Sequence, residues 1–291
     1  MSGPDIQVRA AIPVRRILHT IHAVRDINPL RKVYQDVFGA IAFAERYHEG
    51  EERDMALLYA ANHMIELMAP RRSEPDTTFA RYLDRFGESF HSFELRVESA
   101  PESAESCKAH GLALSTVYPL FFFVKPQSTG GVLVQFCGKP LENDPQDYHN
   151  WNPDWIEGHP SSLRRLHHIA CLVRDREAAL RFFTEIIDGK LLSDERVALP
   201  QPGRCVHVLL GDTKVALYSA DNPKTGVFAD YFAQPRSGIY ALVWEVDSLD
   251  AARQHIEARG FEIEPASLQY CGIAIPERSF SGVRHEFVPC S

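Results

Sequence analysis

Apolar and polar positions follow a pattern that returns after 149 residues, from Leu18 to His167. Behind the stretch 18–26, apolar residues fall at positions 30, 33, 34, 37 and 38, the spacing of one face of an amphipathic helix. The same spacing follows the stretch 167–175, at positions 179, 182, 183, 186 and 187. The pattern therefore predicts a strand and then a helix, twice, and each helix is expected to end at a glycine, Gly39 or Gly189.

A finer repeat lies inside the large one, because the residues 93–98 match 242–247 and the residues 108–111 match 257–260. We therefore expect four modules, each with a strand, a helix and further apolar strands. The modules cover about 15–70, 88–139, 164–220 and 237–290. Proline-rich composition marks the segment between the second and third modules as a connector.

These modules predict an α+β fold of four units, each with a strand, a helix and further strands, and with two modules in each domain. The expected divisions are an N-terminal tail over 1–14, an N-terminal domain over 15–139, a connector over 140–163 and a C-terminal domain over 164–291. Hydrophobic residues at 45% and charged residues at 24% are typical of a globular protein with a core.

Composition narrows the expected partners and compartment. No apolar run approaches the roughly 20 residues that span a bilayer, and the polar start lacks a signal peptide's apolar stretch, so we expect a cytoplasmic protein without membrane contact. The net charge of -8 argues against binding to nucleic acid. A small-molecule partner is expected, and the chain is a candidate for forming a homodimer.

Two positions in each module carry the candidate chemistry. The first position lies five residues before the valine that ends the first strand, and in modules 1 to 4 it is occupied by His19, Ser92, His168 and Ala241. The central polar position of the last strand is Glu66, Gln135, Ala216 or Glu286. A carboxylate in an apolar strand is costly to bury unless a cation, a solvated face or a ligand compensates it. Recurrence of histidine and carboxylate at equivalent positions favours the ligand.

The motif of a histidine, apolar residues, a valine, an aspartate and a helix resembles the vicinal oxygen chelate superfamily. This superfamily includes glyoxalase I, methylmalonyl-CoA epimerase, extradiol dioxygenases and small-molecule resistance proteins. The stretch 123–135 is the part most similar to the epimerase. The resemblance implies an α+β fold of four βαβββ modules that pair into curved, cup-shaped mixed sheets. A divalent metal would be held at the bottom of a cup by one first-strand and one last-strand residue from each of two paired modules.

The resemblance leaves two pairings of the modules open. Pairing of neighbours collects His19, Glu66 and Gln135 in one cup, and His168 with Glu286 in the other. Pairing of module 1 with 4 and of module 2 with 3, which we prefer from the sequence, implies metal ligands His19, Glu66 and Glu286 and a second candidate site of His168 and Gln135. One divalent ion, Mn, Co, Ni, Fe or Zn, suits an imidazole with two carboxylates.

Such an ion stabilises an enolate, which points to an epimerase, isomerase or lyase acting on an oxygenated small molecule, with Glu66 and Glu286 moving protons. A ring-cleaving extradiol dioxygenase with Fe(II) and a metal-free binding or resistance protein are the alternatives. Aromatic candidates for the substrate pocket are Tyr118, Phe122, Trp244 and Tyr270.

Overall fold

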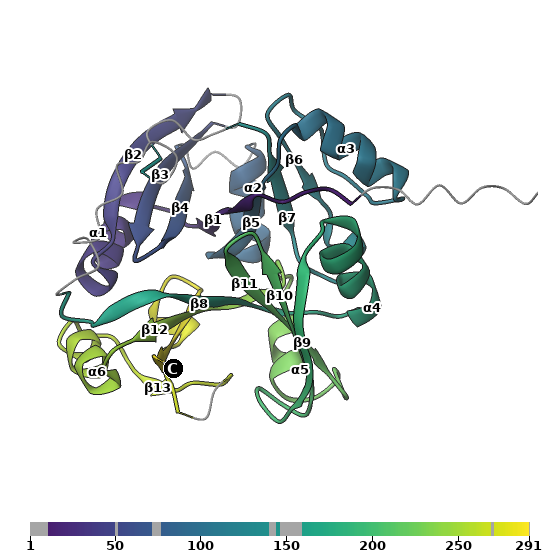
Figure 1. Cartoon of the computed structure of the whole chain (residues 1–291). Coiled ribbons are helices and arrows are strands. Elements are labelled where there is room, and N and C mark those ends of the chain that lie inside the picture. Colours follow the sequence, from purple (N-terminus) through teal and green to yellow (C-terminus); the bar gives the residue numbers. More distant parts are fainter. Residues whose placement is uncertain are drawn as a thin grey trace, which may run out of the picture.

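The computed structural model describes residues 11–49, 52–71, 77–139, 144–145, 159–268 and 271–290. Its strands form two curved mixed sheets, one from each half of the chain (Figure 1). The N-terminal sheet has seven strands in the order β2-β3-β4-β1-β5-β7-β6, and the C-terminal sheet has eight in the order β13-β14-β15-β12-β8-β11-β10-β9. The expected α+β fold is confirmed.

The N-terminal half contains β1 (Arg16–Ala23), α1 (Ile27–Phe38), β2 (Ile41–His48), β3 (Arg53–Ala60), β4 (His63–Pro70), α2 (Thr78–Phe86), β5 (Ser89–Arg96), α3 (Ala100–Ala109), β6 (Phe121–Val124), η2 (Pro126–Ser128) and β7 (Val134–Cys137). Three of these strands, β5, β6 and β7, belong to the second module. Much of the expected connector lies outside the described residues.

The C-terminal half contains β8 (Leu163–Leu172), α4 (Arg176–Leu180), η4 (Arg181–Ile186), β9 (Lys190–Val197), β10 (Gly203–Leu210), β11 (Thr213–Ala220), α5 (Gly226–Phe232), β12 (Ile239–Val246), α6 (Leu249–Glu257), β13 (Glu264–Pro265), β14 (Ile273–Ile275), η5 (Glu277–Ser279) and β15 (Arg284–Pro289). None of the described helices is long and apolar enough to cross a membrane.

Neighbouring modules share a sheet. The first strands pair antiparallel, β1 with β5 and β8 with β12, while β4 and β11 run parallel to the first strands of their own modules. The preferred pairing of module 1 with 4 and of module 2 with 3 is therefore wrong. The physical reason is connectivity: the chain passes from β4 through α2 directly into β5, and consecutive elements usually pack side by side.

Bulges adjust the register at the centre of each sheet. Ile17 lies opposite Leu95 whereas His19 lies opposite Glu94, so Leu18 is an extra residue in β1. The C-terminal sheet has a bulge at the equivalent position. Leu166 and His168 lie opposite consecutive residues of β12, so His167 is the extra residue in β8. Strict alternation therefore fails at these points.

Polar caps hold the helices at the ends of the first strands. The side chains of Asp26 and Asp175 accept backbone N–H bonds from Asn28 and Ala178 at 2.9 and 3.0 Å. Gly39 ends α1 with φ of 64°, as expected. The helix after β8 was expected to end at Gly189 in the same way. Instead α4 continues into the π-helical turn η4, and Asp188 takes the left-handed conformation with φ of 55°.

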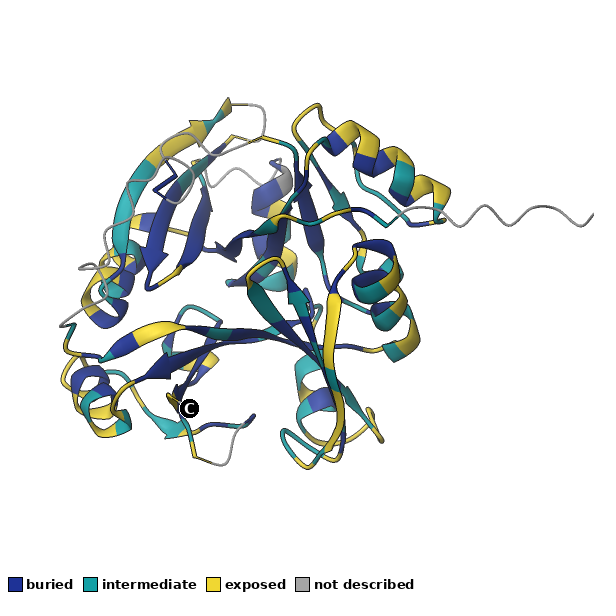
Figure 2. Ribbon diagram, viewed as in Figure 1, coloured by how far each residue is buried: buried dark blue, intermediate teal, exposed yellow. Residues whose placement is uncertain are grey.

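The largest cluster of buried apolar residues includes residues of both sheets. The strands of both sheets are buried over much of their length (Figure 2). Helix α1 contributes Tyr34 and Phe38, and Phe38 contacts Trp244 of β12 with ring centroids 5.5 Å apart. The π-helical turn η4 contributes Phe183, which contacts Phe93 of β5 at 6.2 Å. Each half of the chain therefore sends a helix against the sheet of the other half.

A series of hydrogen bonds crosses this core. The indole Nε1 of Trp244 only donates, so its 3.1 Å bond makes Nδ1 of His285 the acceptor. Nε2 of His285 then donates to the Tyr34 hydroxyl at 3.2 Å, and that hydroxyl donates to Nδ1 of His22 at 3.1 Å. Nε2 of His22 donates to the Ser281 carbonyl oxygen at 2.9 Å. All these bonds exist together only while both imidazoles are neutral.

Burial lowers the pKa of His22 to about 4, whereas an unfolded histidine titrates near 6.5. Below that pH the unfolded chain binds a proton that the folded chain excludes, so stability falls as the pH decreases. We predict that the unfolding free energy of His22→Gln, measured by urea titration between about pH 6.5 and 4.5, depends on pH less steeply than the wild type, by up to about 1.4 kcal/mol per pH unit.

Tyr34→Phe is the matched control, because it breaks the series of bonds and leaves His22 buried. Its unfolding free energy should be lower by about 1–3 kcal/mol at neutral pH, with the steep pH dependence of the wild type retained. Equal pH dependence in the wild type and in His22→Gln would contradict the assignment of a neutral imidazole at position 22.

Candidate functional site

A cavity of about 300 Å³ opens on the curved face of the N-terminal sheet. Its floor is polar and buried, its apolar wall comes from β3 and from residues 120–121, and its mouth is lined by exposed or half-buried residues. The floor consists of His19, Arg53, Glu66, Glu94, Gln135 and Cys137, the apolar wall of Met55, Leu57, Leu120 and Phe121, and the mouth of Arg46, Tyr47, His48 and Lys139.

The register of the sheet brings the floor together. The bulge at Leu18 sets His19 opposite Glu94 across the β1–β5 pair. Glu94 in turn lies beside Gln135 of β7. Curvature closes the far sides, because His48 of edge strand β2 and Phe121 of edge strand β6 have ring centroids only 6.4 Å apart.

Four charged or titratable groups stand in a row across the floor. Nη1 of Arg53 is 3.1 Å from Oε1 of Glu66, and Oε2 of Glu66 is 2.9 Å from Nε2 of His19. On the other side of the ring, Nδ1 of His19 is 3.9 Å from Oε1 of Glu94. The imidazole therefore lies between two buried carboxyl groups, each 3% exposed.

The surroundings shift the pKa of each of these groups. Burial alone would raise the pKa of Glu66, but the charges and contacts of His19 and Arg53 lower it to about 2. Burial raises the pKa of Glu94, and the repulsion of Glu66 adds to that rise while His19 opposes it. Burial would lower the pKa of His19, but the two carboxylates raise it. The site therefore contains one firmly ionised carboxylate and one carboxyl that ionises less readily.

Several donor and acceptor atoms of the floor are buried without a hydrogen-bond partner in the described structure. They are Nδ1 and Nε2 of His19, Oε1 of Glu94 and Oε1 of Gln135. Nε2 of His19 is among them although it is 2.9 Å from Glu66, so this contact lacks hydrogen-bond alignment. Since leaving such atoms unpaired costs about 1–3 kcal/mol each, a ligand is the natural partner.

A divalent ion fits part of this floor. Neighbouring ligands of an octahedral ion at about 2.1 Å lie about 3 Å apart, close to the separation of Nε2 of His19 and Oε2 of Glu66. Within the described ranges, no three His, Cys, Asp or Glu side chains are arranged to hold a metal. The fit therefore depends on the amide oxygen of Gln135 as a further ligand, and water or substrate would complete the set.

Glu94 and Arg53 belong to this floor and escaped the sequence reasoning. Alternation along β5 carries the signal for Glu94, since it lies two residues after Ser92 and shares its face of the sheet. Ser92 itself is buried, and its hydroxyl lies 2.9 Å from Nδ1 of His91. Arg53 carried no comparable signal, because a position at the start of a strand suggests an exposed side chain.

Glu286 lies in the other sheet, on β15, so the expected metal site of His19, Glu66 and Glu286 is not assembled. Its carboxylate accepts bonds from the N–H and hydroxyl of Ser267 at 2.8 and 2.7 Å and from the N–H of Leu268 at 3.2 Å. Nε of Arg284 also donates to it at 2.7 Å. Because both carboxylate oxygens already accept hydrogen bonds, Glu286 holds the loop at residues 267–268 in place and is not available to bind a metal.

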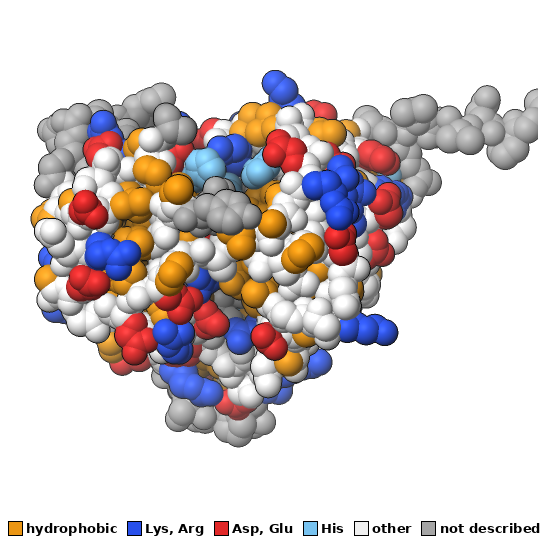
Figure 3. Space-filling model, turned by 90° about the horizontal axis from the view of Figure 1, so that it is seen from below, with side chains coloured by type: hydrophobic (Ala, Val, Ile, Leu, Met, Phe, Trp, Pro, Cys, Tyr) orange, Lys and Arg blue, Asp and Glu red, His pale blue; other side chains and the backbone are white. Residues whose placement is uncertain are grey.

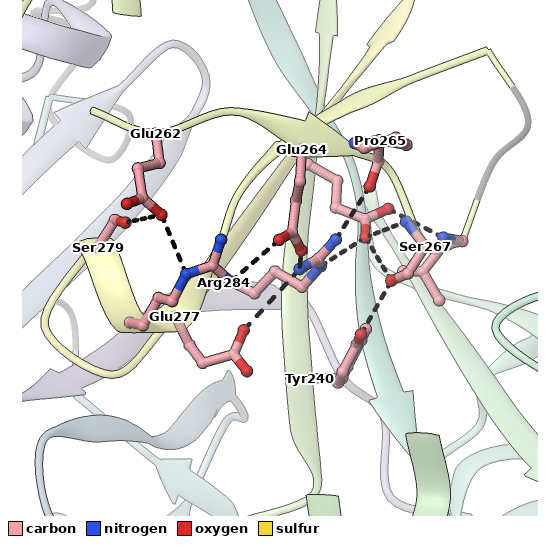
Figure 4. A network of polar contacts seen from close by, with 11 residues as sticks. Tyr240, Glu262, Glu264, Pro265, Ser267, Glu277, Ser279 and Arg284 are labelled. Atoms are coloured by element: carbon pink, nitrogen blue, oxygen red, sulfur yellow. Dashed lines mark hydrogen bonds and ion pairs between the residues drawn. The ribbon is translucent and has the colours of Figure 1, made fainter. Parts of the chain in front are cut away.

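Arg284 extends this anchor into a larger network of ion pairs (Figure 4). It contacts Glu264 and lies 3.8 Å from Glu277. The hydroxyl groups of Ser267 and Tyr240 continue the network at 2.9 Å. Seen from below, on the side of the C-terminal sheet, acidic and basic side chains lie next to one another (Figure 3).

The second candidate site, His168 with Gln135, is not assembled either, because the two residues lie in different sheets. Nδ1 of His168 is 2.7 Å from Nδ1 of His167, so the two rings are in contact, whereas strict alternation along a strand would place them on opposite faces of the sheet. The bulge at His167 explains this. Phe228 of α5 and Leu268 pack against the curved face of the C-terminal sheet, in the same apolar cluster as the alanines at the remaining ligand positions, Ala216 and Ala241.

The four aromatic pocket candidates have different locations. Tyr118 is 42% exposed and stacks on Phe121 of the apolar wall at 4.7 Å. Phe122 points into the core and stacks on Phe136, so its expected role in a pocket is wrong, as alternation along β6 requires. Trp244 is likewise a core residue bonded to His285. Tyr270 lies outside the described residues.

Two stretches of the chain, residues 18–120 and 165–270, match the family described as the Glyoxalase/Bleomycin resistance protein/Dioxygenase superfamily. The mitochondrial methylmalonyl-CoA epimerase of Homo sapiens is 34% identical over 103 residues, which cover 34% of this chain and 56% of the epimerase. The epimerase of Mus musculus is 30% identical over 119 residues, covering 40% and 61%. The chain thus spans less than two thirds of the length of these relatives.

Solved structures resemble the fold over nearly the whole chain. A variant of 4-hydroxymandelate synthase from Streptomyces coelicolor has a TM-score of 0.68 at 15% identity and covers 96% of this chain and 93% of its own. The 2,3-dioxygenase LapB from Pseudomonas sp. KL28 has a TM-score of 0.59 at 13% identity and covers 97% and 94%. At such identities the likeness concerns the fold alone.

Glu286→Gln should destabilise the protein, because an amide nitrogen cannot accept the bonds of Ser267, Leu268 and Arg284. We predict a loss of about 2–4 kcal/mol in unfolding free energy, measured by chemical denaturation at neutral pH. The exposed Glu105→Gln, whose partner Lys108 is also exposed, is the control and should change stability by less than about 0.5 kcal/mol. An unchanged stability of Glu286→Gln would contradict the anchoring role.

Proposed function

Because the chain belongs to the Glyoxalase/Bleomycin resistance protein/Dioxygenase superfamily, we propose that its N-terminal cup is an active site for metal-assisted enolate chemistry on a small oxygenated molecule. The reaction type is an epimerisation, isomerisation or lyase reaction. The observation that carries this proposal is the set of buried polar atoms without a hydrogen-bond partner in the described structure, on His19, Glu94 and Gln135 around one cavity.

The proposed metal ligands are His19, Glu66 and Gln135, the first-strand and last-strand residues of module 1 and the last-strand residue of module 2. Enzymes of this superfamily typically use a divalent metal. When bound, such an ion polarises a substrate carbonyl and stabilises the enolate formed as a proton leaves the neighbouring carbon. Arg53 holds one oxygen of Glu66, which leaves the second oxygen directed at His19.

Glu94 is the proposed proton acceptor, in the role that the sequence suggested for Glu286. Glu94 lines the cavity from the strand opposite His19, and its Oε1 is buried without a hydrogen-bond partner in the described structure, 3.9 Å from Nδ1 of His19. A proton taken from substrate carbon would pass to this oxygen and return from it to the same or a neighbouring carbon.

The alternatives have less support from the site. An extradiol dioxygenase uses two histidines and one carboxylate, whereas Ser92 stands at the position of the second histidine. In a metal-free binding protein, the bound molecule by itself would have to satisfy all the buried polar atoms of the floor that have no hydrogen-bond partner in the described structure. Metal binding and proton transfer distinguish these three functions, so each is measured separately.

Titration of the purified protein with Mn²⁺, followed by electron paramagnetic resonance, tests the metal. We predict about one bound ion per chain and a loss of affinity of at least about tenfold in His19→Ala and in Glu66→Gln. His168→Ala should bind Mn²⁺ as the wild type does, since His168 lies in the other sheet. Loss of binding in His168→Ala alone would move the site to the C-terminal sheet.

Exchange of carbon-bound hydrogen with D₂O tests the chemistry. With a panel of 2-oxo acids and acyl thioesters, Glu94→Gln should exchange about 100-fold more slowly than the wild type while retaining Mn²⁺ affinity. The control Glu98→Gln changes an exposed carboxylate near the same strand and should exchange at the wild-type rate. Equal rates in Glu94→Gln and the wild type would contradict the role of Glu94.

A further inference from the structure

Among the described residues at the mouth of the N-terminal cup, those with a permanent charge are basic, in a protein whose net charge is -8. Arg46 and Lys139, which we call the mouth cations, both line the cavity and both are exposed. The acidic residues that line the same cavity, Glu66 and Glu94, are buried on the floor. Of the described charged residues that line the cavity, a molecule entering the cup therefore meets the basic ones first.

One strand connects the floor to the mouth on the side of Lys139. Gln135 and Cys137 belong to β7 and are two residues apart, so both face the cavity. Lys139 follows two residues later, and its carbonyl oxygen accepts a hydrogen bond from the thiol of Cys137, with a distance of 3.3 Å from Sγ to the oxygen. This contact fixes the backbone of Lys139 next to the cup while its ammonium group remains exposed.

The other mouth cation, Arg46, belongs to the opposite edge of the sheet. Arg46 on edge strand β2 lies opposite Met55 of β3, a residue of the apolar wall. The contact of His48 with Phe121 brings this edge toward β6, the edge strand beside β7. The two cations thus stand on facing sides of one opening.

Apolar groups continue from the apolar wall to the surface at the same opening. The described chain exposes five large hydrophobic side chains, and three of them lie here. Leu120, 48% exposed, and Tyr47, 38% exposed, line the cavity, and Tyr118 stacks on Phe121. Apolar surface grouped at a cavity mouth is typical of a binding site for a ligand with an apolar part.

We infer that the cup takes a small amphipathic organic anion, with its charged group between the mouth cations and its apolar part against the apolar wall. This inference rests on the proposed function, because it assigns a ligand to the same cavity. The volume of about 300 Å³ suits a molecule of one ring or a short chain. The anionic group is a carboxylate or a phosphate ester, since a guanidinium and an ammonium bind both.

The test compares three probes with one apolar part: 3-phenylpropanoate, 3-phenylpropyl phosphate and the neutral 3-phenylpropanamide. Binding to the full chain is measured by ligand-observed NMR, once with added Mn²⁺ and once with a chelator. We expect at least one of the two anions to bind about tenfold more tightly than the amide with chelator present. Whichever anion binds more tightly identifies the anionic group.

Variants connect this preference to the residues. In Arg46→Gln/Lys139→Gln the preference for the anion should fall to within about twofold, with amide binding unchanged. Leu120→Ala should weaken anion and amide alike, by about threefold or more. Lys108→Gln, an exposed lysine on α3, is the control and should retain the full preference.

Equal binding of amide and anions, no binding of any probe up to about 10 mM, or a preference that survives in the double variant would overturn the inference. The chelator arm separates this result from the proposed function. A protein that prefers anions but binds no Mn²⁺ keeps the inferred ligand class and loses the metal-assisted reaction. A protein that binds Mn²⁺ without preferring anions loses only the ligand class.

Discussion

The antiparallel pairing of β1 with β5 decides which side chains of this protein meet. The bulge at Leu18 advances β1 by one residue, so His19 lies opposite Glu94 and on the same face of the sheet. Glu94 is beside Gln135, and Glu66 approaches His19 from β4 on the other side. A buried polar floor is expensive, and this register supplies its compensating contacts.

The same pairing in the C-terminal sheet produces the opposite result. β8 pairs with β12 through an equivalent bulge, but alanines stand where a second carboxylate and a second first-strand ligand would be. Apolar side chains from α5 and from the loop before β14 cover that face, and the remaining carboxylate, Glu286, binds the loop. One sheet thus encloses the polar cavity of the candidate site, while its copy has apolar side chains packed over the equivalent positions.

Much of the fold is readable from the sequence because the repeat gives each module twice. The aspartates at 26 and 175 cap helices at equivalent positions, and the apolar spacing behind them places those helices correctly. The pairing of modules was predicted wrongly, because the positions of histidine and glutamate favoured the exchanged pairing, whereas the direct connection from β4 through α2 to β5 favours neighbours. Bulges were not readable, since an extra residue leaves no mark in the local pattern. Glu286 therefore looked like a partner of Glu66, and Glu94 was overlooked.

The central claim is that function resides on the floor of the N-terminal cup and not between the two halves of the chain. Anomalous X-ray scattering from crystals soaked in Mn²⁺ tests it most directly, because it locates the ion without reference to activity. The account predicts one strong peak within coordination distance of His19 and Glu66. A peak beside Glu286 or His168, with none at His19, would contradict it.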